Sequence, residues 1–421
     1  MTNSAKGPIG IISLFWLPLW GGAEQYHYRL AKELLAKGFD VKVLCGTAAL
    51  ANRDNGSIAV ERFVPTGDIG YASWQNLIGM KSDQNYRSLA LHYAFFDHAV
   101  KWCRQNGIKL VLIGNPLQDA HFFHARELYQ RLQALGIKVG IIHHDLPKPI
   151  SEVLRNNYTL KTGDWSVAAR EVLDSLKRLA SSSLHTVGWT TMVRSPLFFE
   201  PDFILSNSNW SAMFIDPLNR LPRFVLHPLM DATSSQPDGS QDIGHSRAEI
   251  LMVNPQGRKN PDLMAEVILK GPPGRKYRVL KGGWGDSLSG FSELLKPLPQ
   301  AARANVDLVE YVKDMRHAYA ASDLLFFPSF EEGYGMTPVE AMYCGVPVVS
   351  SNYPAILEAV GEGARTLCPY KDPPGKWIAA VEEVLRDRAV WKARALEHSR
   401  FLSNRQNSEF NRLSRFLVEL M

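Results

Sequence analysis

Cysteine is scarce in this chain of 421 residues, and its four copies lie far apart without forming a CxxC pair: Cys45, Cys103, Cys344 and Cys368. Their spacing argues against a zinc knuckle and a disulfide framework, so a reducing compartment is the simpler assumption. The sequence also lacks an apolar run of the ~20 residues that span a bilayer and the pattern of a secretory signal peptide. We therefore expect a cytoplasmic protein, with peripheral contact at the cytoplasmic membrane face left open.

A large excess of one charge is also missing. The chain has 47 Lys and Arg against 42 Asp and Glu, which gives a formal net charge of +5. The basic residues are scattered rather than gathered in runs between aromatic residues, so we expect no nucleic-acid partner. A mildly basic protein suits an anionic substrate such as a nucleotide diphosphate, and it suits an anionic membrane face as well.

Several catalytic motifs are absent too. The sequence has no GxSxG nucleophile elbow and no complete Walker A loop. His121 and His124 lie three positions apart on a predicted helix, a spacing at which two histidines can share a metal ion. Because no third ligand motif such as HExxH accompanies them, we expect no metal site.

The pattern that is present alternates strands and helices. Ile9–Phe15 is an apolar strand, residues 26–35 place apolar side chains on one helical face, and Val41–Cys45 is the next apolar strand. Such a βαβ opening implies a parallel sheet. The alternation continues to a short strand at Phe203–Ser206 and resumes after the Ser-, Gly- and Asp-rich stretch 232–246.

The length favours two domains, at roughly 100–200 residues each. We expect two doubly wound, Rossmann-like α/β domains, residues 1–222 and 223–404, with a cleft between them. Ligands of open α/β sheets bind outside the carboxyl ends of the strands, so the residues just after strands are the candidates for function. Residues 405–421 form an amphipathic helix whose apolar stripe must dock on an apolar surface.

The densest candidate segment follows a predicted strand at Leu324–Pro328 and leads into a helix. Gly333 and Gly335 allow the backbone to approach a ligand closely, and the helix N-terminus offers N–H groups suited to a phosphate. Glu332 and Glu340 flank this turn, and carboxylates accept hydrogen bonds from sugar hydroxyls. The two glutamates can therefore face one bound molecule.

A structural interpretation of the same residues stays open. Thr337, Pro338 and Glu340 also fit a capping box, with Thr337 as N-cap, Pro338 at N1 and Glu340 at N3. Under that interpretation, Glu340 stabilises the start of the helix and need not contact a ligand.

The segment Ala321–Val349, with seven residues between Glu332 and Glu340, resembles the signature of the family-4 group of retaining glycosyltransferases. Weaker similarity extends to Gly21-Gly22-Ala23-Glu24, to His144-Asp145, to Ser206–Trp210 and to Asp314–Tyr319. The resemblance implies a GT-B fold, in which two Rossmann-like domains face each other across a cleft. It also implies that the terminal helix, residues 405–421, crosses back and packs on the first domain.

The resemblance further implies a role for each matching residue. Glu340 would hold the ribose hydroxyls of a nucleotide-sugar donor, Glu332 the donor sugar and Lys259 the diphosphate. Gly22 would approach the β-phosphate, and His144 would lie near the reacting end of the sugar. The catalytic candidates are His144, Lys259 and Glu332.

The chain departs from the family at one position. The family usually has an arginine six residues before the diphosphate-binding lysine, and this sequence has Val253 there. Arg258 could supply the missing charge. Lys259 itself precedes a helix, where a surface lysine is also ordinary. The donor-binding candidates are Gly22, Arg258, Gly335, Met336, Thr337 and Glu340.

We accordingly expect a retaining glycosyltransferase that moves a sugar from a nucleotide diphosphate sugar to an acceptor hydroxyl on a glycan, a lipid-linked molecule or a small molecule. The donor is a substrate, and we expect no cofactor. The alternatives are a non-catalytic sugar-nucleotide binding protein, which Val253 keeps open, and an epimerase or phosphorylase on the same fold.

Overall fold

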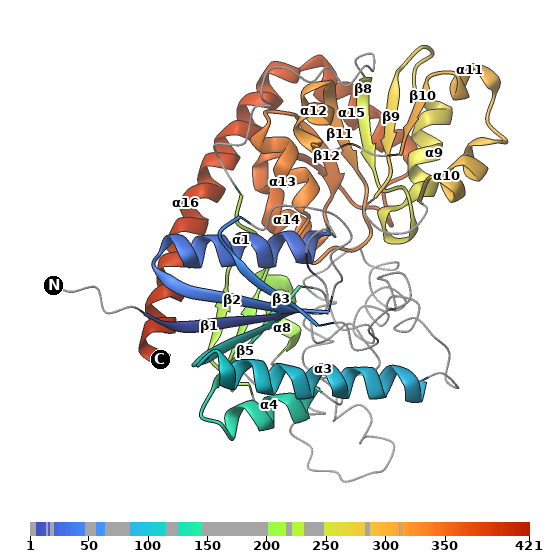
Figure 1. Ribbon diagram of the computed structural model, residues 1–421. Coiled ribbons are helices and arrows are strands. Elements are labelled where there is room, and N and C mark those ends of the chain that lie inside the picture. Colours follow the sequence, from blue (N-terminus) through green and yellow to red (C-terminus); the bar gives the residue numbers. More distant parts are fainter. Residues whose placement is uncertain are drawn as a thin grey trace, which may run out of the picture. The chain divides into compact units, whose positions relative to one another are not determined.

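The computed structural model describes residues 6–13, 16, 21–46, 56–63, 85–114, 125–144, 201–215, 221–230, 248–282, 287–310, 312 and 314–421. These residues divide into two compact units, each built on one parallel sheet (Figure 1). The first unit holds the described residues up to 144, those at 201–229 and those at 408–421, and the second holds 230 and 248–407. The expected α/β class is confirmed.

The first unit has a seven-stranded sheet with the order β3-β2-β1-β4-β5-β6-β7 among its described residues. Its strands are β1 (Lys6–Ser13), β2 (Phe39–Cys45), β3 (Ala59–Arg62), β4 (Leu110–Gly114), β5 (Lys138–His143), β6 (Phe203–Ser206) and β7 (Arg223–Val225). Its helices are α1 (Gly22–Ala36), α3 (Asn85–Gln105), α4 (Ala125–Gln133), α8 (Asn209–Ile215) and the end of α16 (Arg388–Leu420).

Helices bury both faces of this sheet. One core joins α1 and the end of α16 to the side chains on one face, including Ile9, Ile11 and Leu112. A second core joins α3 and α4 to the other face, including Val111 and Ile141. Two buried faces explain why the interior strands β4 and β6 are almost continuously apolar in sequence.

The second unit has a six-stranded sheet with the order β10-β9-β8-β11-β12-β13 in its described part. Its strands are β8 (Ala248–Val253), β9 (Tyr277–Leu280), β10 (Val306–Val309), β11 (Ser322–Phe327), β12 (Val348–Ser351) and β13 (Arg365–Leu367). The α-helices are α9 (Pro261–Lys270), α10 (Ser287–Leu295), α11 (Gln300–Arg303), α12 (Met315–Ala320), α13 (Met336–Tyr343), α14 (Pro354–Val360), α15 (Pro374–Arg386) and the first part of α16. Two 3₁₀ turns, η6 (Gly257–Lys259) and η7 (Gly361–Gly363), complete it.

The boundary between the units lies later than residue 222. β7 pairs with β6 and so belongs to the first sheet, and the first unit runs on to residue 229. Aromatic packing accounts for this placement, because the ring of Phe224 lies 4.3 Å from that of Phe416, which in turn lies 5.2 Å from that of Phe203.

The C-terminal helix is longer than the expected 405–421, since α16 is continuous from Arg388. Its residues from 408 onward belong to the first unit, where Phe410, Leu413 and Leu417 are buried in the core that includes α1. No helix within the described residues is both long and apolar enough to cross a membrane.

Candidate active site

The candidate site of the second unit forms where β8 and β11 end. The two strands are hydrogen-bonded neighbours, so the segments that follow their carboxyl ends lie side by side. The turn η6 follows β8, and the glycine loop, which we define as residues 328–335, follows β11. The backbone N–H of Phe330 donates to the carbonyl of Arg258 at 2.7 Å and ties the two segments together.

Lys259 and Glu332 form an ion pair at this junction. Their side chains are only 14% and 9% exposed. The Ser329 hydroxyl donates to the same Glu332 oxygen at 2.9 Å, and the Lys259 ammonium lies 4.7 Å from the ring centroid of Phe327. Lys259 is therefore not the ordinary surface lysine that the sequence left open.

Electrostatics keep Glu332 ionised in spite of its burial. Burial raises the pKa of this carboxyl, but the charges of Lys259 and Arg258 and the hydrogen bonds from Lys259 and Ser329 outweigh it, so the pKa lies below its ordinary value. The site thus holds a buried carboxylate that can accept hydrogen bonds from a ligand.

The backbone of the turn after β8 explains how Lys259 reaches Glu332. Gly257 and Asn260 have φ angles of 47° and 60°, in the left-handed region. Asn260 then caps α9, because its side-chain oxygen accepts the N–H of Leu263 at 3.3 Å. Pro261 occupies the first turn of that helix, where a missing N–H is harmless.

The start of α13 contradicts the capping-box interpretation. The helix begins at Met336, and its N-cap is Gly335, which makes no side-chain cap and has a φ of 102° that glycine adopts far more readily than other residues. Thr337 therefore lies inside the helix and cannot be its N-cap. Met336 and Thr337 are the first two residues of the helix, where backbone N–H groups lack helical partners.

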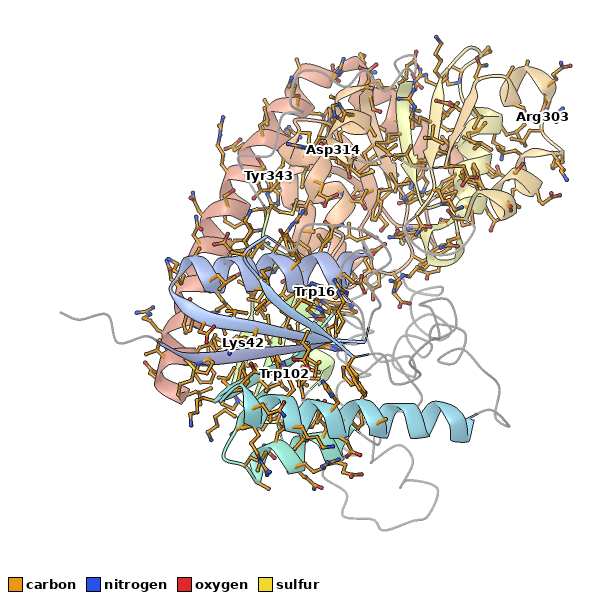
Figure 2. The ribbon with its side chains drawn as sticks, in the orientation of Figure 1. Trp16, Lys42, Trp102, Arg303, Asp314 and Tyr343 are labelled. Atoms are coloured by element: carbon orange, nitrogen blue, oxygen red, sulfur yellow. The ribbon has the colours of Figure 1, made fainter. Side chains whose placement is uncertain are left out.

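Glu340 is oriented by a tyrosine. The Tyr319 hydroxyl donates to a carboxylate oxygen of Glu340 at 3.1 Å and approaches the carbonyl of Thr337 at 3.4 Å. Tyr319 is buried on α12, whose N-cap is Asp314. Figure 2 labels Asp314 and also Tyr343, the last residue of α13. No motif in the sequence predicts a separate role for Tyr319.

Arg258 lies beside the pair but is less enclosed. Its guanidinium is 3.9 Å from the Glu331 carboxylate, with the Arg258 side chain 42% exposed. Val253, at the end of β8, is partly buried. A second cation is therefore present next to Lys259, at a different position from the arginine that the resemblance implies.

Arg405 of α16 supports the glycine loop. It donates to the Tyr334 hydroxyl at 2.8 Å and to the carbonyl of Glu358 at 3.3 Å. Tyr334 is buried, so this contact fixes the segment between Gly333 and Gly335. No motif in the sequence singles out Arg405, because a lone arginine on an amphipathic helix is ordinary.

The two remaining candidates belong to the first unit. Gly22 is the exposed first residue of α1. His144 directly follows β5 and is buried, with its Nε2 2.8 Å from Nε2 of His27. Its sequence neighbour Asp145 lies outside the described residues.

No group of three or more His, Cys, Asp or Glu that could hold a metal ion occurs in the part of the chain that the structure describes. His121 and His124 lie outside that part.

Comparison with known proteins finds sequence similarity in the second unit. Residues 258–387 match the family model described as "Glycosyl transferases group 1". The D-inositol 3-phosphate glycosyltransferase of Mycobacterium marinum is 29% identical over 175 residues, which cover 39% of this chain and 37% of that protein. The match therefore spans much less than half of the relative's length.

Solved structures share the fold over nearly the whole chain. Sucrose-phosphate synthase from Thermosynechococcus elongatus has a TM-score of 0.68 at 14% identity, covering 98% of this chain and 99% of that one. HepE of Anabaena in complex with UDP has a TM-score of 0.65 at 15% identity, with coverage of 98% and 99%. The GT-B fold that the resemblance implied is confirmed.

Proposed function

We propose that this chain, whose residues 258–387 match the family model described as "Glycosyl transferases group 1", transfers a sugar from a nucleotide diphosphate sugar to an acceptor hydroxyl. The observation that supports this most directly is the buried Lys259–Glu332 pair beside the glycine loop that leads into α13. The retention of configuration at the anomeric carbon rests on the family resemblance.

The site provides groups for the charge that develops in such a reaction. As the bond between the anomeric carbon and the diphosphate oxygen breaks, negative charge collects on the leaving group. The Lys259 ammonium and the backbone N–H groups of Met336 and Thr337 at the start of α13 would stabilise that charge. In this proposal the reaction needs neither a metal ion nor a cofactor.

The two carboxylates would bind the neutral parts of the donor. Glu332 would accept hydrogen bonds from hydroxyls of the sugar, and Glu340, oriented by Tyr319, from those of the ribose. The roles of Gly22 and His144 in the first unit stay predictions from the resemblance.

The solved structure from Anabaena contains UDP, so UDP-sugars are the first donors to test. The acceptor hydroxyl, on a glycan, a lipid-linked molecule or a small molecule, is left unassigned. We further predict a cytoplasmic location and no nucleic-acid partner. Peripheral contact at the cytoplasmic membrane face is the alternative to test.

The test is the substitution Glu340→Gln, with nucleotide diphosphate binding measured by calorimetry. Removing a charged hydrogen-bond acceptor should lower the affinity about tenfold or more, because such bonds contribute roughly 1.5–3 kcal/mol. Glu383→Gln is the matched control, since Glu383 of α15 pairs with Arg365 in the same unit. Equal affinity in the two variants would refute the donor-site assignment.

Val253 favours one alternative, a protein that binds sugar nucleotides without turning them over. Incubation with a panel of nucleotide sugars and acceptors separates the two functions. Tight binding of a donor without transfer or hydrolysis supports the alternative, and donor consumption that rises with added acceptor supports the transferase. Conversion of the donor into a different nucleotide sugar, with the bond to the diphosphate intact and no acceptor present, would instead indicate an epimerase.

A further inference from the structure

A chain of three polar side chains is buried where the central strands of the first unit end. Ser13 is the last residue of β1, and His144 directly follows β5, two places along in the sheet order β1-β4-β5. His27 of α1 lies between them. The three residues are 4%, 5% and 1% exposed for Ser13, His144 and His27, respectively.

The contacts join these side chains in series. Nε2 of His27 lies 2.8 Å from Nε2 of His144, and Nδ1 of His27 lies 3.3 Å from the Ser13 hydroxyl. Gly114, the last residue of β4, makes room for the His27 ring, because a Cβ at position 114 would lie 2.3 Å from Cε1 of that ring. The contacts with Ser13 and His144, together with the space left by Gly114, thus determine the position of the His27 ring.

Two facing ring nitrogens constrain each other. Only one of them can carry the proton of the hydrogen bond, so the tautomer of His144 is coupled to that of His27. Burial lowers the pKa of His27 to about 3 and lowers that of His144 well below its usual range, so both rings are neutral near pH 7. The Ser13 hydroxyl can donate or accept, and therefore completes the chain in either tautomer.

We propose that His27 is a positioning residue for His144. By engaging Nε2 of His144, His27 holds the orientation of the His144 ring and couples the tautomer of His144 to its own, and Nδ1 of His144 is left to act on a ligand. This inference rests on the proposed function, in which His144 lies near the reacting end of the donor sugar.

Packing on the same ring offers a matched control. The ring of Tyr26 meets that of His144 edge-on at 4.7 Å, and its hydroxyl donates to the carbonyl of Leu226 at 2.9 Å. Tyr26→Phe therefore keeps the ring contact with His144 and loses one buried hydrogen bond, which is not part of the Ser13–His27–His144 series. A purely structural role of His27 would make His27→Phe and Tyr26→Phe behave alike.

The experiment compares wild type, His27→Phe, His27→Gln and Tyr26→Phe in the full-length protein. Sugar transfer gives kcat and KM, and NMR of ¹⁵N-histidine-labelled protein gives the tautomer of His144. We expect His27→Phe to lower kcat about 10- to 100-fold, as misplacement of a reacting group does, with KM for the donor within about twofold. His27→Gln, whose amide can reach the His144 nitrogen, should recover most of the rate.

The NMR measurement separates the inference from the function on which it rests. In His27→Phe the ring-nitrogen shifts of His144 should move, while in Tyr26→Phe they should stay at their wild-type values. Unchanged His144 shifts in His27→Phe, or a kcat equal to that of Tyr26→Phe, would overturn the inference. Wild-type protein that transfers no sugar would defeat the proposed function, and the His144 shifts would still decide whether His27 controls the orientation and the tautomer equilibrium of the His144 ring.

Discussion

Replacing Lys259 with methionine tests the electrostatics of the candidate site. Methionine keeps an unbranched apolar stem beside Phe327 and removes the charge that pairs with Glu332. Breaking a buried ion pair by removing one partner costs roughly 3–5 kcal/mol, because the other charge remains buried. Ser329 still donates to Glu332 and Arg258 still adds positive charge, so we expect about 3 kcal/mol near pH 7.

The loss should depend on pH with a predictable sign. In the wild type, the pKa of Glu332 is lower in the folded than in the unfolded protein. Its contribution to stability is therefore present above the unfolded pKa of about 4.3 and is lost as the pH falls through the folded pKa. In Lys259→Met, burial remains the largest influence and should raise the pKa above the unfolded value. The destabilisation should then grow as the pH rises from about 4 towards 8.

Hydrogen exchange in urea, followed on peptides that cover β11 and α13, measures this loss in the second unit by itself. The control is Lys281→Met, whose lysine pairs with the exposed Glu310 at 2.8 Å. An exposed pair contributes only about 0–1 kcal/mol, and its loss should show no such pH slope. The double variant Lys259→Met, Glu332→Gln should be more stable than the single one at pH 7. A loss that does not change between pH 4.5 and 7.5 would refute the reasoning.

Tyr319→Phe should weaken nucleotide binding about tenfold in calorimetry, since it removes the hydroxyl that donates a hydrogen bond to Glu340. Tyr343→Phe should leave the affinity unchanged. Transfer activity should persist in excess chelator, because the described residues offer no ligand cluster; loss that a divalent ion reverses would contradict this. Deleting residues 408–421 exposes a core that buries three large side chains of α16, at roughly 1.5–3 kcal/mol each, so an unchanged melting temperature would be incompatible with that packing.

Much of the fold could be predicted because its strands are buried on both faces. Phe203–Ser206 coincides with β6, and the predicted strand Leu324–Pro328 overlaps β11 at Ser322–Phe327. Short, continuously apolar runs between turn residues carry this information locally. Which strand pairs with which is not determined by the local sequence. The strand β7 at Arg223–Val225 pairs with β6, and contacts with Phe416, far away in the sequence, accompany this pairing.

In the candidate site, too, local features could be predicted from the sequence and contacts between distant segments could not. Residue chemistry and the resemblance pointed to Glu332 and Lys259, and the structure brings these two together in the second unit. Tyr319, Arg405 and His27 were given no role, because each acts through a contact with a distant segment that has no signature of its own. The capping-box interpretation failed for a local reason, since Gly335 can take a backbone conformation that starts the helix one residue before Thr337.

The position of Arg258 bears on what Val253 means for the reaction. Two cations, Arg258 and Lys259, lie next to two carboxylates, Glu331 and Glu332. The formal charges of these four side chains therefore sum to zero before any ligand binds. In the proposed reaction, a diphosphate would therefore share Lys259 with Glu332 rather than meet an uncompensated cation. Because Val253 adds no further charge, the backbone N–H groups at the start of α13 would have to supply a larger part of the leaving-group stabilisation than if the arginine implied by the resemblance were present.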